Sequence, residues 1–377
     1  MSCSDLPKGD DIIKKNFTEA AAAFLTAMLA GAMITAGKET AVETARAVTL
    51  CLTVMIPSLY AFTVVSKLLI STDTYKLLGK PFSLFTRYVM RMPSEFFPIF
   101  VISQLAGYPI GASLINELRS QEKISSKTAS DMLCFCISPG PAYIMTASLA
   151  AAPDCPQIWT AVFLSLTGAN LIGVLITSFF REIPPPSESK CNIKFNAEIF
   201  TSSVKSGANS MMMICSMIVF MAAVLGIFGK YGVLRLITWA VSAICGMEAV
   251  EIYPFVRSFF EISSITSVIG DATVTIPITA AMLSFGGLCV HLQITAVCKD
   301  FSPLKGLLMR VPTAVLSCFI CSQLIPKMYT VSILAANTDV ADSSIHAVNN
   351  PPILSLILLI MTILILSQKT IEKNRLM

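Results

Sequence analysis

The sequence predicts an all-α, polytopic membrane protein. Of its 377 residues, 54% are hydrophobic and only 13% are charged, whereas soluble domains average roughly 25% charged residues. The mean hydropathy is +0.73, and the apolar residues gather in runs of about 20, the length that a helix needs to cross a bilayer. So few polar side chains cannot cover the surface of a soluble protein. The same composition excludes collagen-like, disordered and disulfide-scaffold proteins.

Charge and motif content exclude several functions. The net charge of +4 is scattered without a basic run, so no nucleic-acid partner is expected. Most of the 12 cysteines lie inside apolar runs, where a thiol behaves as a small hydrophobe. With only two histidines, His291 and His346, we expect no metal site and no cofactor. The G-x-x-x-x-G-K-[ST], H-E-x-x-H and G-x-S-x-G motifs are absent, so we expect neither ATP-driven transport nor an enzyme.

The pattern of apolar runs divides the chain into five regions. They are an N-terminal segment with the first transmembrane helix (1–46), a first half (47–180), a linker rich in proline and charge (181–198), a second half (199–325), and a C-terminal region with a polar loop, a final transmembrane helix and a basic tail (326–377). The linker contains Pro184-Pro185-Pro186 and is the clearest boundary.

The first spans also predict the topology. An alanine-rich run at 18–36 predicts an uncleaved first helix, and 48–70 predicts a second span that contains Pro57. The amphipathic stretch 71–91 carries four cations against one acidic residue, Asp73. Because Lys and Arg mark cytoplasmic loops, this stretch and the N-terminus two spans before it are predicted to be cytoplasmic.

Two places in the first half are too rich in glycine and proline to continue as helix. A short apolar helix at 96–105 runs into Ala106-Gly107-Tyr108-Pro109-Ile110-Gly111-Ala112. Another short helix at 127–136 ends at Ser138-Pro139-Gly140-Pro141. A helix at 142–151 and a full span at 159–180 complete this half.

The second half has a similar order of segments. A helix begins at Ile199 and is apolar over 211–228, and a further span is predicted at 233–250, followed by a charged stretch at 251–261. A short apolar piece then meets Ser284-Phe285-Gly286-Gly287, and 307–324 predicts another span. In the C-terminal region, 353–367 predicts the final span. The cations that place the C-terminus in the cytoplasm are Lys369, Lys373 and Arg375.

The two halves therefore resemble an inverted repeat with broken or re-entrant helices. In each half a span, a polar connector and a short apolar helix broken at glycine precede a closing span, and Gly107 compares with Gly286. Matched, interrupted apolar segments indicate a transporter-type site, because broken helices free backbone N–H and C=O groups inside the membrane. The alternative is that these glycines and prolines serve only close helix packing.

The residues at the breaks resemble a known family. Gly107-Tyr108-Pro109-Ile110-Gly111-Ala112, followed by Glu117-Leu118-Arg119, is similar to the first-half signature of the YlbJ-type sporulation integral membrane proteins, part of the nucleoside-recognition Gate-domain group. The segment 284–293 resembles that family's Gly-Gly segment, which is followed by a glutamine. Phe260-Glu261-Ile262-Ser263 is similar to the family's acidic motif. The resemblance covers 48–324 and implies two Gate-like halves and a role in endospore formation. Cys136-Ile137-Ser138 differ from the asparagines that the family places before its turn.

Several polar residues near the breaks are candidates for binding a solute. Glu261 is an ionisable group at membrane depth, which is usually functional, unless it lies at the water interface beside Glu251 and Arg257. Glutamine and histidine side chains can bind a solute or join helices, and Asp271 is expected to cap the next helix. The candidate site residues are Gln104, Gly107, Tyr108, Pro109, Gly111, Ser138, Glu261, Gly286, Gly287, His291 and Gln293.

Two functions fit these observations. The first is a transporter or permease for a small solute in the cell membrane, with a site between the broken helices and both termini in the cytoplasm. The second is a non-transporting membrane scaffold of a sporulation complex. The expected partners are the lipid bilayer, an unidentified small solute, and a second copy of the chain or other sporulation membrane proteins. A polar lining that converges on both breaks would favour transport, and breaks filled by apolar side chains would favour the scaffold.

Overall fold

The protein is helical throughout its described part. The computed structural model describes residues 9–153, 155–184, 193, 195–298 and 303–338, with side chains between residues 19 and 328 of these ranges. It is 82% helix, and no strand occurs among these residues, so the all-α prediction is confirmed. The chain forms two compact units, Met1–Tyr329 and Thr330–Met377, and the arrangement given below is that of the first.

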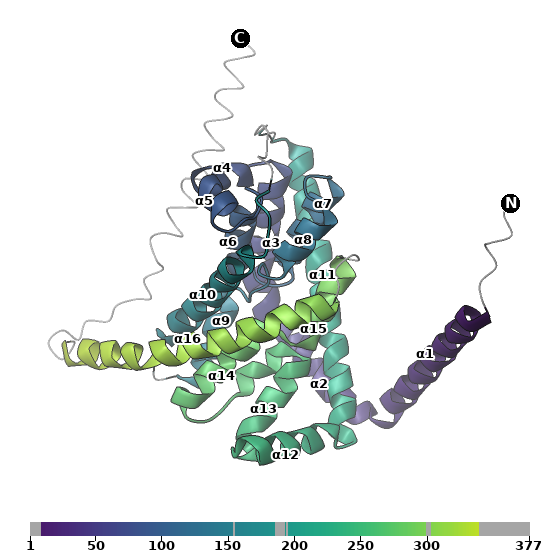
Figure 1. Cartoon of the computed structure of the whole chain (residues 1–377). Helices are drawn as coiled ribbons and strands as arrows, with labels where there is room; N and C mark the ends of the chain where they lie inside the picture. The colour runs from purple at the N-terminus through teal and green to yellow at the C-terminus, as the bar shows by residue number, and fades with distance from the viewer. Residues whose placement is uncertain (1–8, 154, 185–192, 194, 299–302, 339–377) are drawn as a thin grey trace, which may run out of the picture. The chain divides into compact units, whose positions relative to one another are not determined.

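The helices follow one another through short connections (Figure 1). The α-helices are α1 (Gly9–Thr35), α2 (Gly37–Leu50), α3 (Ile56–Ser71), α4 (Tyr75–Gly79), α5 (Ser83–Tyr88), α6 (Phe96–Ala106), α7 (Ile110–Ser120), α8 (Ser126–Leu133), α9 (Pro141–Ala151), α10 (Ile158–Ser178), α11 (Ala197–Lys230), α12 (Val233–Cys245), α13 (Ala249–Phe260), α14 (Ala272–Phe285), α15 (Gly287–Val297) and α16 (Pro303–Thr338). A π-helix, η1 (Cys51–Met55), joins α2 to α3, and the 3-10 helices are η2 (Lys80–Phe82) and η3 (Ile262–Ser267).

Five helical segments are long and apolar enough to cross a membrane, and one bent pair could add a sixth. They are Gly37–Ser71, Ile158–Ser178, Ala197–Lys230, Ala272–Val297 and Lys305–Met328. The prediction of a polytopic membrane protein is therefore confirmed. The predicted first span is a shorter apolar helix, Glu19–Thr35. The following predictions lie outside the described residues: most of the linker, the polar loop with His346, the final span at 353–367, and the basic tail with Lys369, Lys373 and Arg375.

The second predicted span is one continuous helix with a wider turn in its middle. The π-helix η1 directly precedes Pro57, the second residue of α3. A proline has no N–H to donate, and its ring crowds the carbonyl four residues before it. Widening the preceding turn accommodates that ring without breaking the helix. The result is the 35-residue helix Gly37–Ser71.

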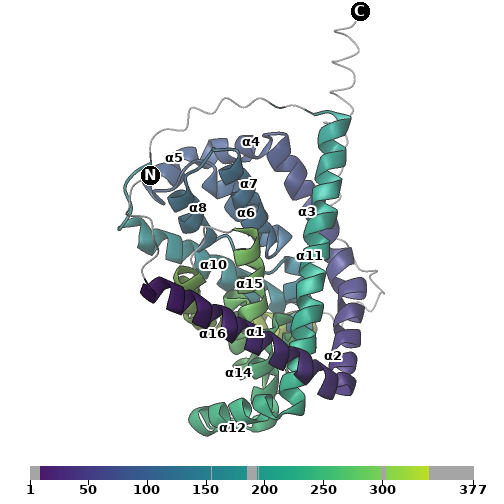
Figure 2. The ribbon, with the colours of Figure 1, turned by 90° about the vertical axis from the view of Figure 1, so that its right-hand side faces the viewer.

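The 34-residue helix α11 packs antiparallel along this helix. Gly226 of α11 lies against the backbone of Thr40, and Gly207 lies against Val64, so two glycines allow the helices to approach closely. The ion pair between Lys230 Nζ and Glu39 Oε1, 2.9 Å long, joins the two helices beyond Gly226. This antiparallel pair forms one side of the first unit (Figure 2).

The span predicted at 233–250 is not one continuous helix. Helix α12 ends before Gly246, whose φ of 70° places it in the left-handed region that glycine adopts readily. The chain then turns by 118° into α13. Large apolar side chains of α12 are exposed to the surroundings, including Leu236, Trp239 and Ile244. Such a helix is typical of one that lies along a membrane surface.

A second segment of this kind, α4 to α5, lies at the opposite end of the unit (Figures 1 and 2). Leu84 and Phe85 are exposed there beside the cations Lys80 and Arg87, as predicted for the amphipathic stretch. Helix α11 runs between the two ends, and its length of about 50 Å follows from a rise of about 1.5 Å per residue. A bilayer with its headgroups is about 40–45 Å thick, so α11 is long enough to reach from one surface to the other.

We expect Gly226→Ala to destabilise the protein by about 1–3 kcal/mol. A Cβ at Gly226 would lie 2.8 Å from the Thr40 Cα, so the backbones of α11 and α2 must move apart. The control is Gly229→Ala on the same helix, where a Cβ would meet nothing within 4 Å, and alanine there should be neutral or stabilising. Thermal unfolding of the detergent-purified variants measures this. Equal midpoints for the two variants would contradict the close approach.

Candidate functional site

Four of the interruptions between described helices lie close together inside the first unit. Gly107, with φ of 81°, separates α6 from α7. The non-helical segment 134–140 separates α8 from α9, and Glu261 separates α13 from η3. Gly286, with φ of 88°, separates α14 from α15. Glycine occupies two of these positions because left-handed backbone is costly for other residues.

The four breaks touch one another. A Cβ on Gly107 would lie 2.9 Å from the Gly140 nitrogen, and one on Gly286 would lie 3.7 Å from the Tyr108 ring. A Cβ on Gly287 would lie 2.8 Å from the Ser258 carbonyl oxygen, at the end of α13. We call the region where the breaks at 107–109, 134–140, 261 and 286–287 meet the break junction.

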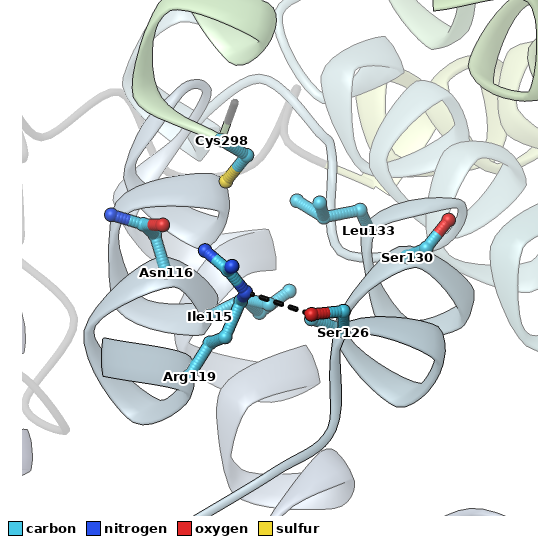
Figure 3. Close-up of a pocket in the computed structure, with 8 residues that line it drawn as sticks. Ile115, Asn116, Arg119, Ser126, Ser130, Leu133 and Cys298 are labelled. Carbon is cyan, nitrogen blue, oxygen red and sulfur yellow. Dashed lines mark hydrogen bonds between the residues drawn. The ribbon is translucent and has the colours of Figure 1, made fainter. Parts of the chain in front are cut away.

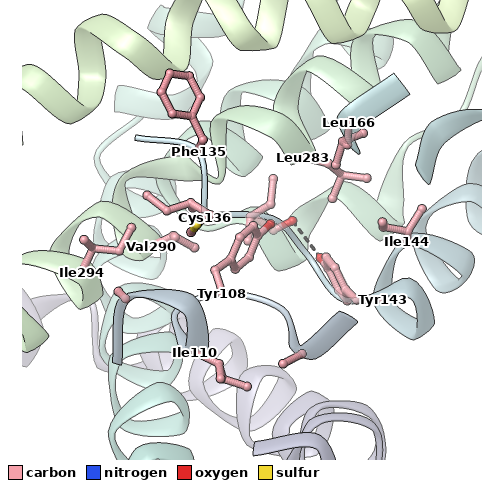
Figure 4. Close-up of a cluster of buried hydrophobic side chains, with 14 of the residues drawn as sticks. Tyr108, Ile110, Phe135, Cys136, Tyr143, Ile144, Leu166, Leu283, Val290 and Ile294 are labelled. Atoms are coloured by element: carbon pink, nitrogen blue, oxygen red, sulfur yellow. Dashed lines mark hydrogen bonds between the residues drawn. The ribbon is translucent and has the colours of Figure 1, made fainter. Parts of the chain in front are cut away.

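Aromatic side chains also connect the breaks. The Tyr143 hydroxyl, at the start of α9, donates a hydrogen bond of 3.0 Å to the Ile262 carbonyl oxygen, next to Glu261. Tyr108 and Tyr143 lie among buried side chains that come from both halves of the chain, including Val290 and Leu283 (Figure 4). Residues of the first two breaks and residues that adjoin the other two thus share one buried cluster.

Arg310 of α16 holds two of the breaks together. It is fully buried. Its Nη2 donates 2.8 Å to the Ile137 carbonyl oxygen and also donates to the Ser284 carbonyl oxygen. Its Nη1 donates 2.7 Å to Oδ1 of Asn170 on α10 and 3.4 Å to the Cys134 carbonyl oxygen. One guanidinium group therefore binds the carbonyls freed where α8 and α14 end.

These carbonyls also neutralise the charge of Arg310. The C-terminal end of a helix carries about half a negative elementary charge, and both α8 and α14 end at the guanidinium group. Two such ends offset roughly one positive charge. Sequence reasoning missed Arg310 because it lies inside the apolar run 307–324. The signal was present: a lone arginine within a span is costly and rarely placed there without a role.

The structure buries every candidate site residue. It brings together Gly107, Tyr108, Glu261, Gly286 and Gly287 at the break junction. The remaining candidates lie on the adjoining segments: Gln104 on α6, Pro109 in a cis peptide bond with Tyr108, Gly111 at the start of α7, Ser138 in the 134–140 segment, and His291 and Gln293 on α15.

Tight packing surrounds part of the junction. A Cβ on Gly111 would lie 2.1 Å from the Cys136 carbonyl oxygen, so only glycine fits there. The His291 ring lies 5.0 Å from the Phe285 ring, centre to centre. The Gln293 amide donates to the Cys289 sulfur at 3.4 Å. Close packing therefore explains why glycine occupies position 111, and the Gln293 amide nitrogen already has a partner within α15.

Many polar atoms at the junction and on the segments that adjoin it have no hydrogen-bond partner among the described residues. Buried polar groups are nearly always paired in folded proteins, and an unpaired one is costly. Here the unpaired atoms belong to Gln104 (both amide atoms), Tyr108 (hydroxyl), Ser138 (hydroxyl), Glu261 (Oε2), Ser284 (hydroxyl), His291 (Nε2) and Arg310 (Nε). They offer both donors and acceptors at one place in the molecule.

The remaining acidic predictions have clear positions. Asp271 caps α14, since its side chain accepts a hydrogen bond of 2.9 Å from the Thr273 N–H, which confirms that prediction. Glu261 is 2% exposed, and its Oε1 accepts 2.9 Å from the Ser263 N–H. Arg257 does not pair with Glu261, because the Arg257 guanidinium group donates to the carboxylate of Glu43 on α2 at 2.6 and 3.1 Å.

Two hollows lie outside the junction. A small one between α7, α8 and the end of α15 is lined by Asn116, Arg119, Ser126 and Cys298, and the Arg119 Nε donates 3.1 Å to the Ser126 hydroxyl (Figure 3). The neighbouring Glu117 pairs with Lys67 of α3 at 3.4 Å. The other, of about 260 Å³, lies between α2, α11 and α13 beside the two ion pairs of Glu39 and Glu43.

We expect Arg310→Met to destabilise the protein by at least about 3 kcal/mol, since each buried acceptor left without a donor costs about 1–3 kcal/mol. The substitution keeps the apolar stem but removes the donors to Ile137, Ser284 and Asn170. Arg235→Met, at an exposed position of α12, is the matched control. Chemical unfolding in detergent gives both values. Similar stability of the two variants would rule out Arg310 as the group that joins the breaks.

Comparisons with known proteins give no further guide. Searches found no matching family model, no matching curated protein and no matching solved structure. The function must therefore be argued from the break junction.

Proposed function

We propose that this chain is a transporter or permease for a small polar solute, acting without ATP hydrolysis and without enzymatic chemistry. One observation carries the proposal: of the 16 buried polar side-chain atoms without a hydrogen-bond partner among the described residues, 8 belong to residues of the break junction or of the segments that adjoin it. In membrane proteins, irregular backbone is tolerated where it is buried in protein or lines a path for solute. A polar solute would supply the partners that Gln104, Ser138 and Ser284 lack.

A repeat in the break sequences supports this proposal. Ser138-Pro139-Gly140 in the first half corresponds to Ser284-Phe285-Gly286 in the second, and Arg310 binds carbonyls at both, those of Ile137 and Ser284. Under this pairing the Gly107 break corresponds to the Glu261 break. We propose that this pairing of the breaks replaces the sequence-based pairing of Gly107 with Gly286. The chain then consists of two Gate-like halves, and each half contributes two breaks to the site.

The resemblance to the sporulation membrane proteins extends the proposal to a cellular role. It rests on Gly107-Tyr108-Pro109-Ile110-Gly111-Ala112 and on the 284–293 segment, both of which border the break junction. We propose that the chain acts in the cell membrane during endospore formation, alone, as a homo-oligomer or with other sporulation membrane proteins. The label of nucleoside recognition makes nucleosides one class of solute to test.

A membrane scaffold is the second candidate function. Gly111 and Gly287 favour it, because each lies so close to neighbouring backbone that its role is explained by packing. Packing does not explain the unpaired atoms of Gln104, Ser138 and Ser284. The two functions therefore differ in what polar substitutions should do, whereas glycine substitutions would disturb both.

Solute binding tests the proposal directly. Thermal unfolding of the purified protein is measured with nucleosides, divalent metal ions and dipicolinate as separate probes. We expect one probe to raise the midpoint, and Ser284→Ala and Gln293→Leu to weaken its binding by about 1–3 kcal/mol each through loss of a hydrogen-bonding group. Gln323→Leu, at an exposed position of α16, is the control. Unchanged binding in both junction variants would place the solute elsewhere and favour the scaffold.

We also propose that the end with α4 and α5 faces the cytoplasm, together with the N-terminus. Lys76, Lys80, Arg87 and Arg91 lie there, and such residues mark the cytoplasmic side. Cys245, the last residue of α12, is exposed at the opposite end. An impermeant thiol reagent added to intact cells should label Cys245, and Cys245→Ser should abolish the signal. Labelling of Lys76→Cys in that Cys245→Ser background would reverse the topology.

A further inference from the structure

We propose that Glu261 is the proton-binding group of this protein, and that its proton is released to water when the break junction opens. The inference rests on the proposed transport function and deepens it, since it makes the proton the coupling ion. It starts from the contrast between two buried charged groups at the junction. Both terminal nitrogens of Arg310 donate hydrogen bonds, whereas one of the two oxygens of Glu261 has no partner among the described residues.

The carboxyl group of Glu261 is only partly hydrogen-bonded. Oε1 accepts from the Ser263 N–H at 2.9 Å, and Oε2 has no hydrogen-bond partner among the residues that the structure describes. The side chain is 2% exposed, so water does not solvate the second oxygen. An ionised carboxylate in such a place carries an energetic penalty of several kcal/mol. Binding a proton removes the charge and with it that penalty.

Among the described residues, none of the groups around Glu261 supplies a cation for it. The neighbouring hydroxyls and thiols are neutral acids, the nearby arginines are engaged elsewhere, and His291 packs against Phe285. Arg257 is bound to Glu43 on α2, and Arg310 to the carbonyls of the broken helices. The titratable and charged side chains in the surroundings of Glu261 are those of Cys51 of η1, Tyr108 of the first break, Tyr143 of α9, Arg257 of α13, Cys289 and His291 of α15, and Arg310 of α16.

The geometry favours a proton over a metal ion at this position. Oε1 is already bound to a backbone N–H, so Glu261 offers one free oxygen. One oxygen is enough to hold a proton, whereas hard metal ions take six or more oxygen ligands.

The position of Glu261 also connects its charge to movement of the helices. It is the residue at which α13 ends, and the adjoining Ser258 and Ile262 contact Gly287 of the α14–α15 break. Separation of α13 from Gly287 would expose the carboxyl group to water. The O–H bond would then break, the proton would pass to water, and the carboxylate would be stabilised by hydration.

A carbodiimide tests proton binding without any solute. Dicyclohexylcarbodiimide reacts with protonated carboxyl groups in apolar surroundings, and mass spectrometry locates the adduct. We expect modification of Glu261 at about pH 6 and at least a roughly tenfold smaller modified fraction at about pH 9, since each pH unit above a pKa lowers the protonated fraction tenfold. Glu251 of α13, which is partly exposed, is the internal control. An unmodified Glu261 at about pH 6 would overturn the proposal.

Glu261→Gln gives a second test, because glutamine has the shape of the protonated side chain and no charge. The wild-type midpoint of unfolding should fall as pH rises from about 4 to the pH at which the folded protein releases its proton, since over this range the folded protein holds a proton that the unfolded chain has already released at the ordinary Glu value of about 4.3. The variant should lose most of this dependence. Equal pH dependence in both proteins, or a sodium-induced rise in the wild-type midpoint that the variant lacks, would overturn the proton site.

Coupling is tested separately in proteoliposomes. Once a probe solute gives uptake, an imposed pH gradient should change uptake by the wild type at least severalfold and should not change uptake by Glu261→Gln. If uptake by the wild type does not change with the pH gradient, the proposal of proton coupling is overturned. Failure to find any transported solute, with Glu261 still modified by the carbodiimide, would instead count against the proposed transport function.

Discussion

The fold depends on how carbonyl groups freed by broken helices are satisfied inside an apolar protein. Lipid offers no hydrogen-bond donors, so each such carbonyl needs a partner within the chain. Arg310 meets this requirement for the carbonyls of Cys134, Ile137 and Ser284. Its guanidinium group has a rigid set of N–H donors that can bind several acceptors at once. Because the carbonyls come from two distant segments, this one side chain fixes the two halves relative to each other.

Glycine makes this arrangement sterically possible. Gly107 and Gly286 take up left-handed backbone where helices end, and Gly111 lets α7 reach the 134–140 segment. At each of these positions a side chain would force apart segments whose polar groups need one another. The junction is therefore held by backbone contact and by one buried cation, with few side-chain hydrogen bonds among its own polar residues. That leaves the polar atoms of Gln104, Ser138 and Ser284 available.

Local pattern explains what the sequence could predict. Spans such as α10 and α11 follow from apolar runs alone, and Asp271 could be assigned as a cap because an N-cap acts within one helical turn. The bend at Gly246 was missed because 233–250 is predominantly apolar on both sides of it, and hydropathy does not register a change in chain direction. Arg310 was missed for a similar reason: its role depends on carbonyls that lie 26 to 176 residues away in the chain.

The two buried charges at the junction differ in how they are stabilised. The charge of Arg310 is permanent, since an arginine does not lose its proton in proteins, and the ends of α8 and α14 offset it with fixed dipoles. The charge of Glu261 has no fixed counterpart, because its one bonded oxygen uses a single N–H and its other oxygen has none. A group that can gain or lose a proton suits a place where the surroundings change. The permanent charge therefore holds the breaks together, and the titratable one is free to follow their movement.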